Sequence, residues 1–125
     1  MSNSVNLMFL LYIVSEEDDK TIRDKVSRAL GVQFRPSETE GRELMGRADF
    51  DGVVLGMEIH LSWTDETPSA NIYRLSGGTS GRAWNTEAEL FSLDDYVARL
   101  LRTMGISRPM KRDEFSEYCD QNGIE

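Results

Sequence analysis

The sequence has few of the residues that form disulfide bonds or bind zinc in small proteins. It contains one cysteine, Cys119, and one histidine, His60. A single cysteine closes no internal disulfide, so nothing points to an oxidising compartment. One histidine and one cysteine also argue against the usual zinc sites, which combine several such ligands. We therefore expect no metal site, and the sequence shows no cofactor motif.

Long hydrophobic runs are also missing. The run at residues 7–14 has no lysine or arginine before it, and four acidic residues follow at 16–19. A signal peptide has the opposite charge order, and a membrane-spanning helix needs about 20 apolar residues. We interpret the run as a buried strand of a cytoplasmic protein. A short core helix is the alternative, because periodicity does not separate the two over so short a run.

Basic residues are in the minority. The chain of 125 residues has 14 Lys and Arg against 22 Asp and Glu, which gives a net charge of −8. This balance argues against nonspecific binding to nucleic acid or to anionic membranes. With 39% hydrophobic and 29% charged residues, the composition is that of a globular protein, and the length fits one domain spanning residues 1–125.

Helical and strand patterns alternate along the chain. We expect a helix at 16–30 between a Ser15 cap and Gly31, and a helix at 92–104 between a Ser92 cap and Gly105. A short helix is expected at 113–121 and a strand at 70–75, followed by a flexible loop at 76–81. The strand–helix–three strands–helix order predicts an α+β domain with a mostly antiparallel sheet and helices packed on one face.

A β-hairpin is predicted around the Asp51-Gly52 dipeptide, which is a strong turn signal. Pairing Phe50 with Val53 separates an apolar face from a polar one. The apolar face collects Leu44, Ala48, Phe50, Val53, Leu55, Met57, Ile59, Leu61 and Trp63. The polar face collects Glu43, Met45, Arg47, Asp49, Val54, Gly56, Glu58, His60, Ser62 and Thr64.

The polar face raises two catalytic hypotheses. His60 stands opposite Glu43 in this register, and a carboxylate beside an imidazole is the arrangement that orients a general base. Asp49 and Glu58 are paired carboxylates of the kind that a hydrolase or a divalent metal uses. An ordinary exposed cross-strand pair explains the first arrangement. Acids that simply flank turns explain the second, which has no motif behind it. We predict no catalytic residue and no enzyme.

Acidic residues concentrate between Glu38 and Glu66, where eight acids and two arginines give a net charge of −6. The pattern predicts a docking surface for a basic partner, with an ordinary solvated face as the alternative. The candidate desolvated anchors of such an interface are Met45, His60, Tyr73 and Trp84. The predicted partner-binding residues are Glu43, Asp49, Asp51, Glu58, His60, Asp65, Glu66 and Tyr73.

In outline, this small acidic chain resembles the immunity proteins of bacterial toxin systems, including contact-dependent growth inhibition. The strand at 9–14, helix at 16–30, hairpin at 44–64, further strand and helix at 92–104 are similar to several α+β antitoxins. The resemblance implies tight binding to a cognate toxin, often a nuclease, whose active site is covered or whose basic substrate groove is occupied. Two alternatives remain: a small-molecule-binding protein or enzyme with a pocket near Glu43, Glu58 and His60, and an adaptor or homo-oligomer subunit.

Overall fold

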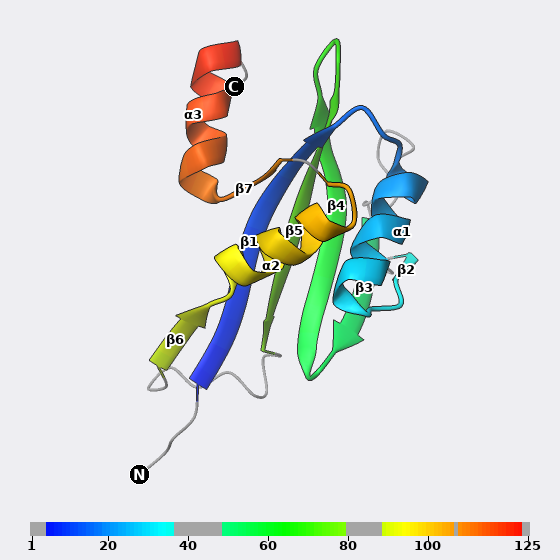
Figure 1. Cartoon of the computed structure of the whole chain (residues 1–125), viewed down its shortest axis with the longest axis vertical. Helices are drawn as coiled ribbons and strands as arrows, with labels where there is room; N and C mark the ends of the chain where they lie inside the picture. Colours follow the sequence, from blue (N-terminus) through cyan, green and yellow to red (C-terminus); the bar gives the residue numbers. More distant parts are fainter. Residues whose placement is uncertain (1–4, 37–48, 80–88, 107, 124–125) are drawn as a thin grey trace.

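The computed structural model describes residues 5–36, 49–79, 89–106 and 108–123. Within these ranges the chain forms three helices and seven strands (Figure 1). In chain order they are β1 (Val5–Ser15), α1 (Asp19–Leu30), β2 (Arg35–Pro36), β3 (Asp49–Val54), β4 (Met57–Glu66), β5 (Asn71–Thr79), β6 (Glu89–Ser92), α2 (Asp94–Thr103), β7 (Pro109–Met110) and α3 (Arg112–Asn122).

The strands form one sheet in the order β2-β3-β4-β5-β1-β6, and β7 also pairs with β1. All pairs in the described sheet are antiparallel except β1 with β6. The predicted α+β domain with a mostly antiparallel sheet is therefore confirmed. The apolar run at 7–14 lies in β1, which has paired neighbours on both edges, so the strand interpretation is right and the helix alternative is wrong.

The starts of α1 and α2 differ from the predicted caps. Asp18 caps α1 by accepting a hydrogen bond from the Thr21 amide at 2.9 Å, whereas Ser15 ends β1. The residue at the N-cap of α2 is Leu93, which makes no side-chain cap, and Ser92 ends β6. Asp94 instead accepts a hydrogen bond from the Leu10 amide at 2.9 Å, so α2 begins tied to the edge of β1.

The predicted hairpin exists, but its turn lies four residues further along the chain. β3 and β4 pair Phe50 with Leu61 and Val54 with Met57, and Leu55 and Gly56 form the turn with φ values of 51° and 77°. Positive φ at both central residues is what a type I′ hairpin turn requires. The Asp51-Gly52 turn is therefore wrong, because both residues lie inside β3.

Gly52 is needed for close packing rather than for a turn. A Cβ atom there would lie 2.5 Å from Val32 Cγ2 and 2.8 Å from the Gln33 carbonyl oxygen. Glycine inside a strand often marks such a close approach of another segment. The turn signal in the sequence thus came from a glycine that makes room for the chain after α1.

Moving the turn changes the face of the residues around it. Ile59 and Leu61 stay on the buried face as predicted, because both registers pair even-numbered with odd-numbered residues. Val53 and Leu55, predicted on the apolar face, are 65% and 92% exposed. Val54, predicted on the polar face, packs against the core.

The predicted loop at 76–81 is also corrected, because residues 76–79 continue β5 between β4 and β1. A Cβ atom on Gly77 would lie 2.3 Å from Phe9 Cε1 and 2.7 Å from Ile59 Cδ1. The Phe9 ring therefore occupies the space that a side chain on Gly77 would need. Residues 80 and 81 lie outside the described residues.

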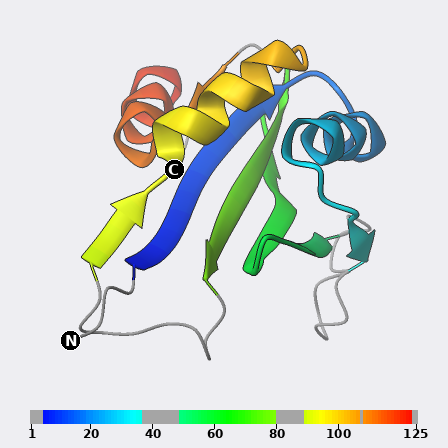
Figure 2. The ribbon, with the colours of Figure 1, turned by 60° about the horizontal axis from the view of Figure 1, so that its bottom comes forward.

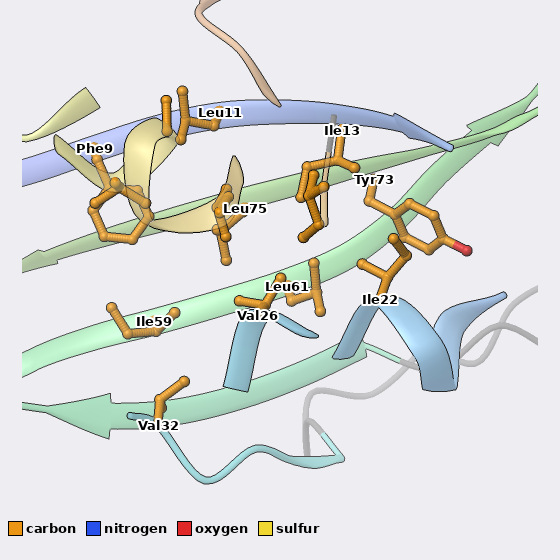
Figure 3. Packing of buried hydrophobic residues seen from close by; sticks show 14 of the residues in the cluster. Phe9, Leu11, Ile13, Ile22, Val26, Val32, Ile59, Leu61, Tyr73 and Leu75 are labelled. Carbon is orange, nitrogen blue, oxygen red and sulfur yellow. The ribbon is translucent and has the colours of Figure 1, made fainter. Parts of the chain in front are cut away.

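The main core lies between the sheet and the α1–α2 layer. Figure 2 shows α1 and α2 on the same side of the sheet. Figure 3 shows Ile22 and Val26 pointing from α1 into the cluster that contains Leu61 of β4 and Leu75 of β5. Alternate residues of the central strands, such as Phe9, fill the sheet side of this core.

The third helix, predicted at 113–121, contacts the opposite face. Tyr12 alternates with the core residues Leu11 and Ile13, and its ring stacks on Phe115 of α3 with centroids 4.1 Å apart. Ile72, on that same face of β5, is buried although it is outside the main core cluster. Among the described helices, none has the length and apolar character that crossing a membrane would require.

Candidate functional site

The sheet face turned away from α1 and α2 carries the candidate site, and we call it the outer face. Its residues alternate along each strand with the buried core residues. The register of β3, β4, β5 and β1 sets the residues of these strands in cross-strand rows. One row contains Val53, Glu58, Gly78 and Met8; the next contains Asp51, His60, Ser76 and Leu10; the third contains Asp49, Ser62, Arg74 and Tyr12.

A shallow depression of about 360 Å³ lies on the outer face, and we call it the trough. Its floor follows β5, because Gly78 has no side chain and Ser76 has a small one. Longer side chains on the neighbouring strands flank this floor, with Met8 and Leu10 on β1 and Glu58 and His60 on β4. The trough is lined by Met8, Phe9, Leu10, Glu58, His60, Arg74, Ser76, Gly77, Gly78 and Thr79.

The two walls of the trough differ in chemistry. The β1 wall is apolar, whereas the β4 wall carries the exposed carboxylate of Glu58. Asp51 stands directly behind His60 on β3, with its Oδ1 atom 3.8 Å from His60 Nε2. Basic side chains also lie on this face. Arg74 lies at one end of the trough, and Arg35 on β2 pairs in register with Asp51. The outer face is therefore patterned by charge rather than uniformly acidic.

A second hollow lies where the end of β4 meets α3. Asp65 and Glu66 line it with the following turn at 67–69 and with Tyr118 of α3, and its volume is about 620 Å³. Asp65 Oδ1 accepts a hydrogen bond from the Glu66 amide at 2.8 Å. Both acids are exposed, and the row that contains Arg74 separates them from Glu58.

The structure brings together only some of the predicted partner-binding residues. Glu58 and His60 line the trough from β4, and Asp51 is the β3 neighbour of His60. His60 faces Asp51 rather than Glu43, because the turn lies later than predicted. Glu43 lies outside the described residues, as do Met45 and Trp84.

Asp49 and Tyr73, also predicted to bind the partner, lie on β3 and β5. Asp49 begins β3 in register with Ser62, but its side chain is not among those described. Tyr73 was predicted as an exposed anchor, and this is wrong: it is 1% exposed in the core. Its hydroxyl donates a hydrogen bond to the Glu17 carbonyl at 2.7 Å and lies 3.2 Å from Asp19 Oδ1. Tyr73 thus anchors the start of α1 to the sheet.

Sequence reasoning missed most of the trough. The sequence predicts Met8 and Leu10 only as part of a buried strand, and it predicts no role for Arg74, although all three line the trough. The sequence predicts Ser76 and Gly78 in a flexible loop, whereas in the structure both lie in β5 and form the floor of the trough. The alternation of side chains could have indicated the trough. If the strand at 70–75 continues to residue 79, the even-numbered residues Arg74, Ser76 and Gly78 lie on one face.

Cys119 of α3 is half-buried, and its thiol chemistry offers a separate test. Burial raises the pKa of the Cys119 thiol, and the carboxylates of Asp120 and Asp65 raise it further. Because the thiolate is the reactive species, alkylation by iodoacetamide at neutral pH should be slower than alkylation of glutathione and should speed up as the pH rises. Asp120→Asn removes a negative charge, lowers the pKa and should increase the rate. A rate equal to that of glutathione and unaffected by this substitution would contradict the assignment.

Among the described residues, no group of three or more histidine, cysteine or carboxylate side chains is placed to hold a metal ion. No family model, curated protein sequence or solved structure matches this chain.

Proposed function

We propose that this protein is an immunity-type binding protein that neutralises a cognate, basic toxin of the nuclease kind by tight association. The observation that carries the proposal is the placement of Asp51 and Glu58 next to the trough, on the sheet face that α1 and α2 leave uncovered. Acidic side chains on a rigid sheet complement the basic groove that a nuclease uses to hold phosphates.

Apolar contacts are the second requirement of a tight interface. Binding energy concentrates in a few desolvated residues, while rim charges mainly steer association. Met8 and Leu10 supply apolar surface beside the acids, and both are half-buried. Asp65 pairs with Ile72 further along the same strand, beyond the row of Arg74, and lines the hollow beside α3. The outer face therefore offers both components within one surface.

A small-molecule-binding protein or enzyme is the second candidate, and the trough itself favours it. Glu58, His60, Arg74 and Ser76 converge on one depression, and convergent polar groups in a hollow are typical of ligand sites. In this case His60→Ala or Glu58→Gln would abolish turnover or ligand binding without changing the affinity for any protein.

Co-expression tests the proposed function directly. The protein encoded beside this chain is expressed in bacteria alone, with the wild-type chain, and with the Asp51→Lys/Glu58→Lys variant. We expect toxicity that the wild-type chain abolishes and that the variant fails to abolish, together with a stoichiometric purified complex for the wild type. Equal protection by the variant would overturn the role of the outer face. A neighbouring protein that is neither toxic nor bound would overturn the immunity proposal.

A further inference from the structure

We infer that the trough binds an extended segment of the basic partner that carries a lysine or arginine and, four residues further on, an aspartate or glutamate. This inference rests on the proposed function and names the part of the partner that the outer face recognises. The trough has opposite charges at its two ends: Glu58 lies in the row of Gly78, and Arg74 lies in the row of Ser62. Both side chains are exposed and line the same hollow.

Strand geometry sets the spacing of the two charges. Gly78 and Arg74 are four residues apart on β5, which is about 13 Å at the rise of an antiparallel strand. An extended segment that lies along β5 has the same rise, so its residues i and i+4 reach Glu58 and Arg74 together. Because side chains alternate in an extended chain, residues i, i+2 and i+4 all point into the trough.

The floor and the apolar wall suit such a segment. Gly78 and Ser76 let a backbone approach β5 closely, and the Ser76 hydroxyl offers a hydrogen-bonding group on the floor. Residue i+2 of the segment then lies beside Met8 and Leu10, where an apolar side chain is favoured. The stem of a lysine or arginine at position i packs along the same wall while its charged end reaches Glu58.

The test uses two capped pentapeptides of identical composition, Lys-Thr-Leu-Thr-Glu and Lys-Glu-Leu-Thr-Thr, titrated to millimolar concentration into the isotopically labelled chain. Only the first places its charges four residues apart. We expect its amide chemical-shift changes to centre on Ser76, Gly77 and Gly78. We also expect it to bind about fivefold more tightly than the second peptide, as two exposed charge pairs allow. The Glu58→Gln/Arg74→Gln variant should lose this preference.

A steric variant separates the trough from general electrostatics. Ser76→Leu fills the floor and leaves every charge in place, so it should abolish peptide binding. Ser116→Leu makes the same change at an exposed position of α3 and should leave binding intact. Equal affinity of the two peptides, shifts centred elsewhere, no shifts at all, or undiminished binding by Ser76→Leu would each overturn the inference. The co-expression result is independent of these outcomes, so the proposed function stands or falls separately.

Discussion

Replacing Gly77 with alanine is expected to lower the free energy of unfolding by about 1–3 kcal/mol, the usual cost of overpacking a core. The added Cβ atom would lie 2.3 Å from Phe9 Cε1 and 2.6 Å from Phe9 Cζ. Phe9 is 1% exposed, so its ring has no free space to move into without displacing other core residues. Urea unfolding of the wild type and the variant, followed by circular dichroism, measures the difference.

Gly78→Ala is the matched control on the next residue of the same strand. Its Cβ atom would lie 3.3 Å from the Leu7 carbonyl oxygen and 3.9 Å from Met8 Cβ, which is a far milder contact. We expect a smaller loss of stability than for Gly77→Ala, and replacing Phe9 with leucine should restore part of the stability of Gly77→Ala. Equal stability of the two alanine variants would contradict the placement of β5 against β1.

Reversing the charges of Asp51 and Glu58 to lysine should slow association with the basic partner by about tenfold at low salt. The reversal replaces attraction at the outer face with repulsion, so the dependence of the rate on salt should also flatten. Stopped-flow or surface-based kinetics at several salt concentrations measures both effects. The Glu16→Lys/Asp24→Lys variant makes the same change in net charge away from the outer face.

The control variant separates local from global electrostatics. Glu16 lies in the connection between β1 and α1, and Asp24 is exposed on α1, whose buried side packs on the other face of the sheet. We expect this variant to associate faster than Asp51→Lys/Glu58→Lys at low salt, with a difference that shrinks as salt screens the charges. Identical rates for the two variants would mean that net charge alone governs association.

Patterns that depend on local chemistry predicted the elements well. The apolar run at 7–14, the acidic start and Gly31 end of α1, and the apolar stripe of α2 each corresponded to a real strand or helix. Side-chain alternation also placed Ile59 and Leu61 on the buried face, although the register was wrong. Hydrophobic alternation depends on whether residues are odd or even in number, and a shift of the turn by four residues preserves this parity.

Glycines produced the main errors. The sequence predicts Gly52 in a turn and Gly77 in a loop, but each makes room for a side chain or backbone that is distant in the sequence. The residue type does not show whether a glycine is required by a turn or by a tertiary contact. Only the three-dimensional fold distinguishes the two cases. The real turn uses Leu55 at a positive φ, which nothing in the residue type indicates.

The part of the site on β3 and β4 could be predicted from the sequence, whereas the part on β1 and β5 depends on tertiary contacts. Acidic residues on one strand pair were visible in the sequence, so Asp51, Glu58 and His60 were identified. The partners from β1 and β5 depend on which strands are neighbours, and β5 pairs with a strand more than fifty residues earlier. The prediction that Tyr73 is exposed is wrong because α1 covers the face of β5 on which Tyr73 lies, and the sequence does not show which face a helix covers.

Capture from a lysate of the native cells tests the central claim most directly, namely that the outer face binds a basic protein. Three tagged baits are compared at low and high salt with mass spectrometry: the wild type, Asp51→Lys/Glu58→Lys and Glu16→Lys/Asp24→Lys. The account predicts one stoichiometric basic protein on the wild type and on the Glu16→Lys/Asp24→Lys bait, recovered in lower yield at high salt and depleted on the Asp51→Lys/Glu58→Lys bait. Undiminished retention of the same protein by the outer-face variant, or the absence of any stoichiometric basic protein, would contradict it.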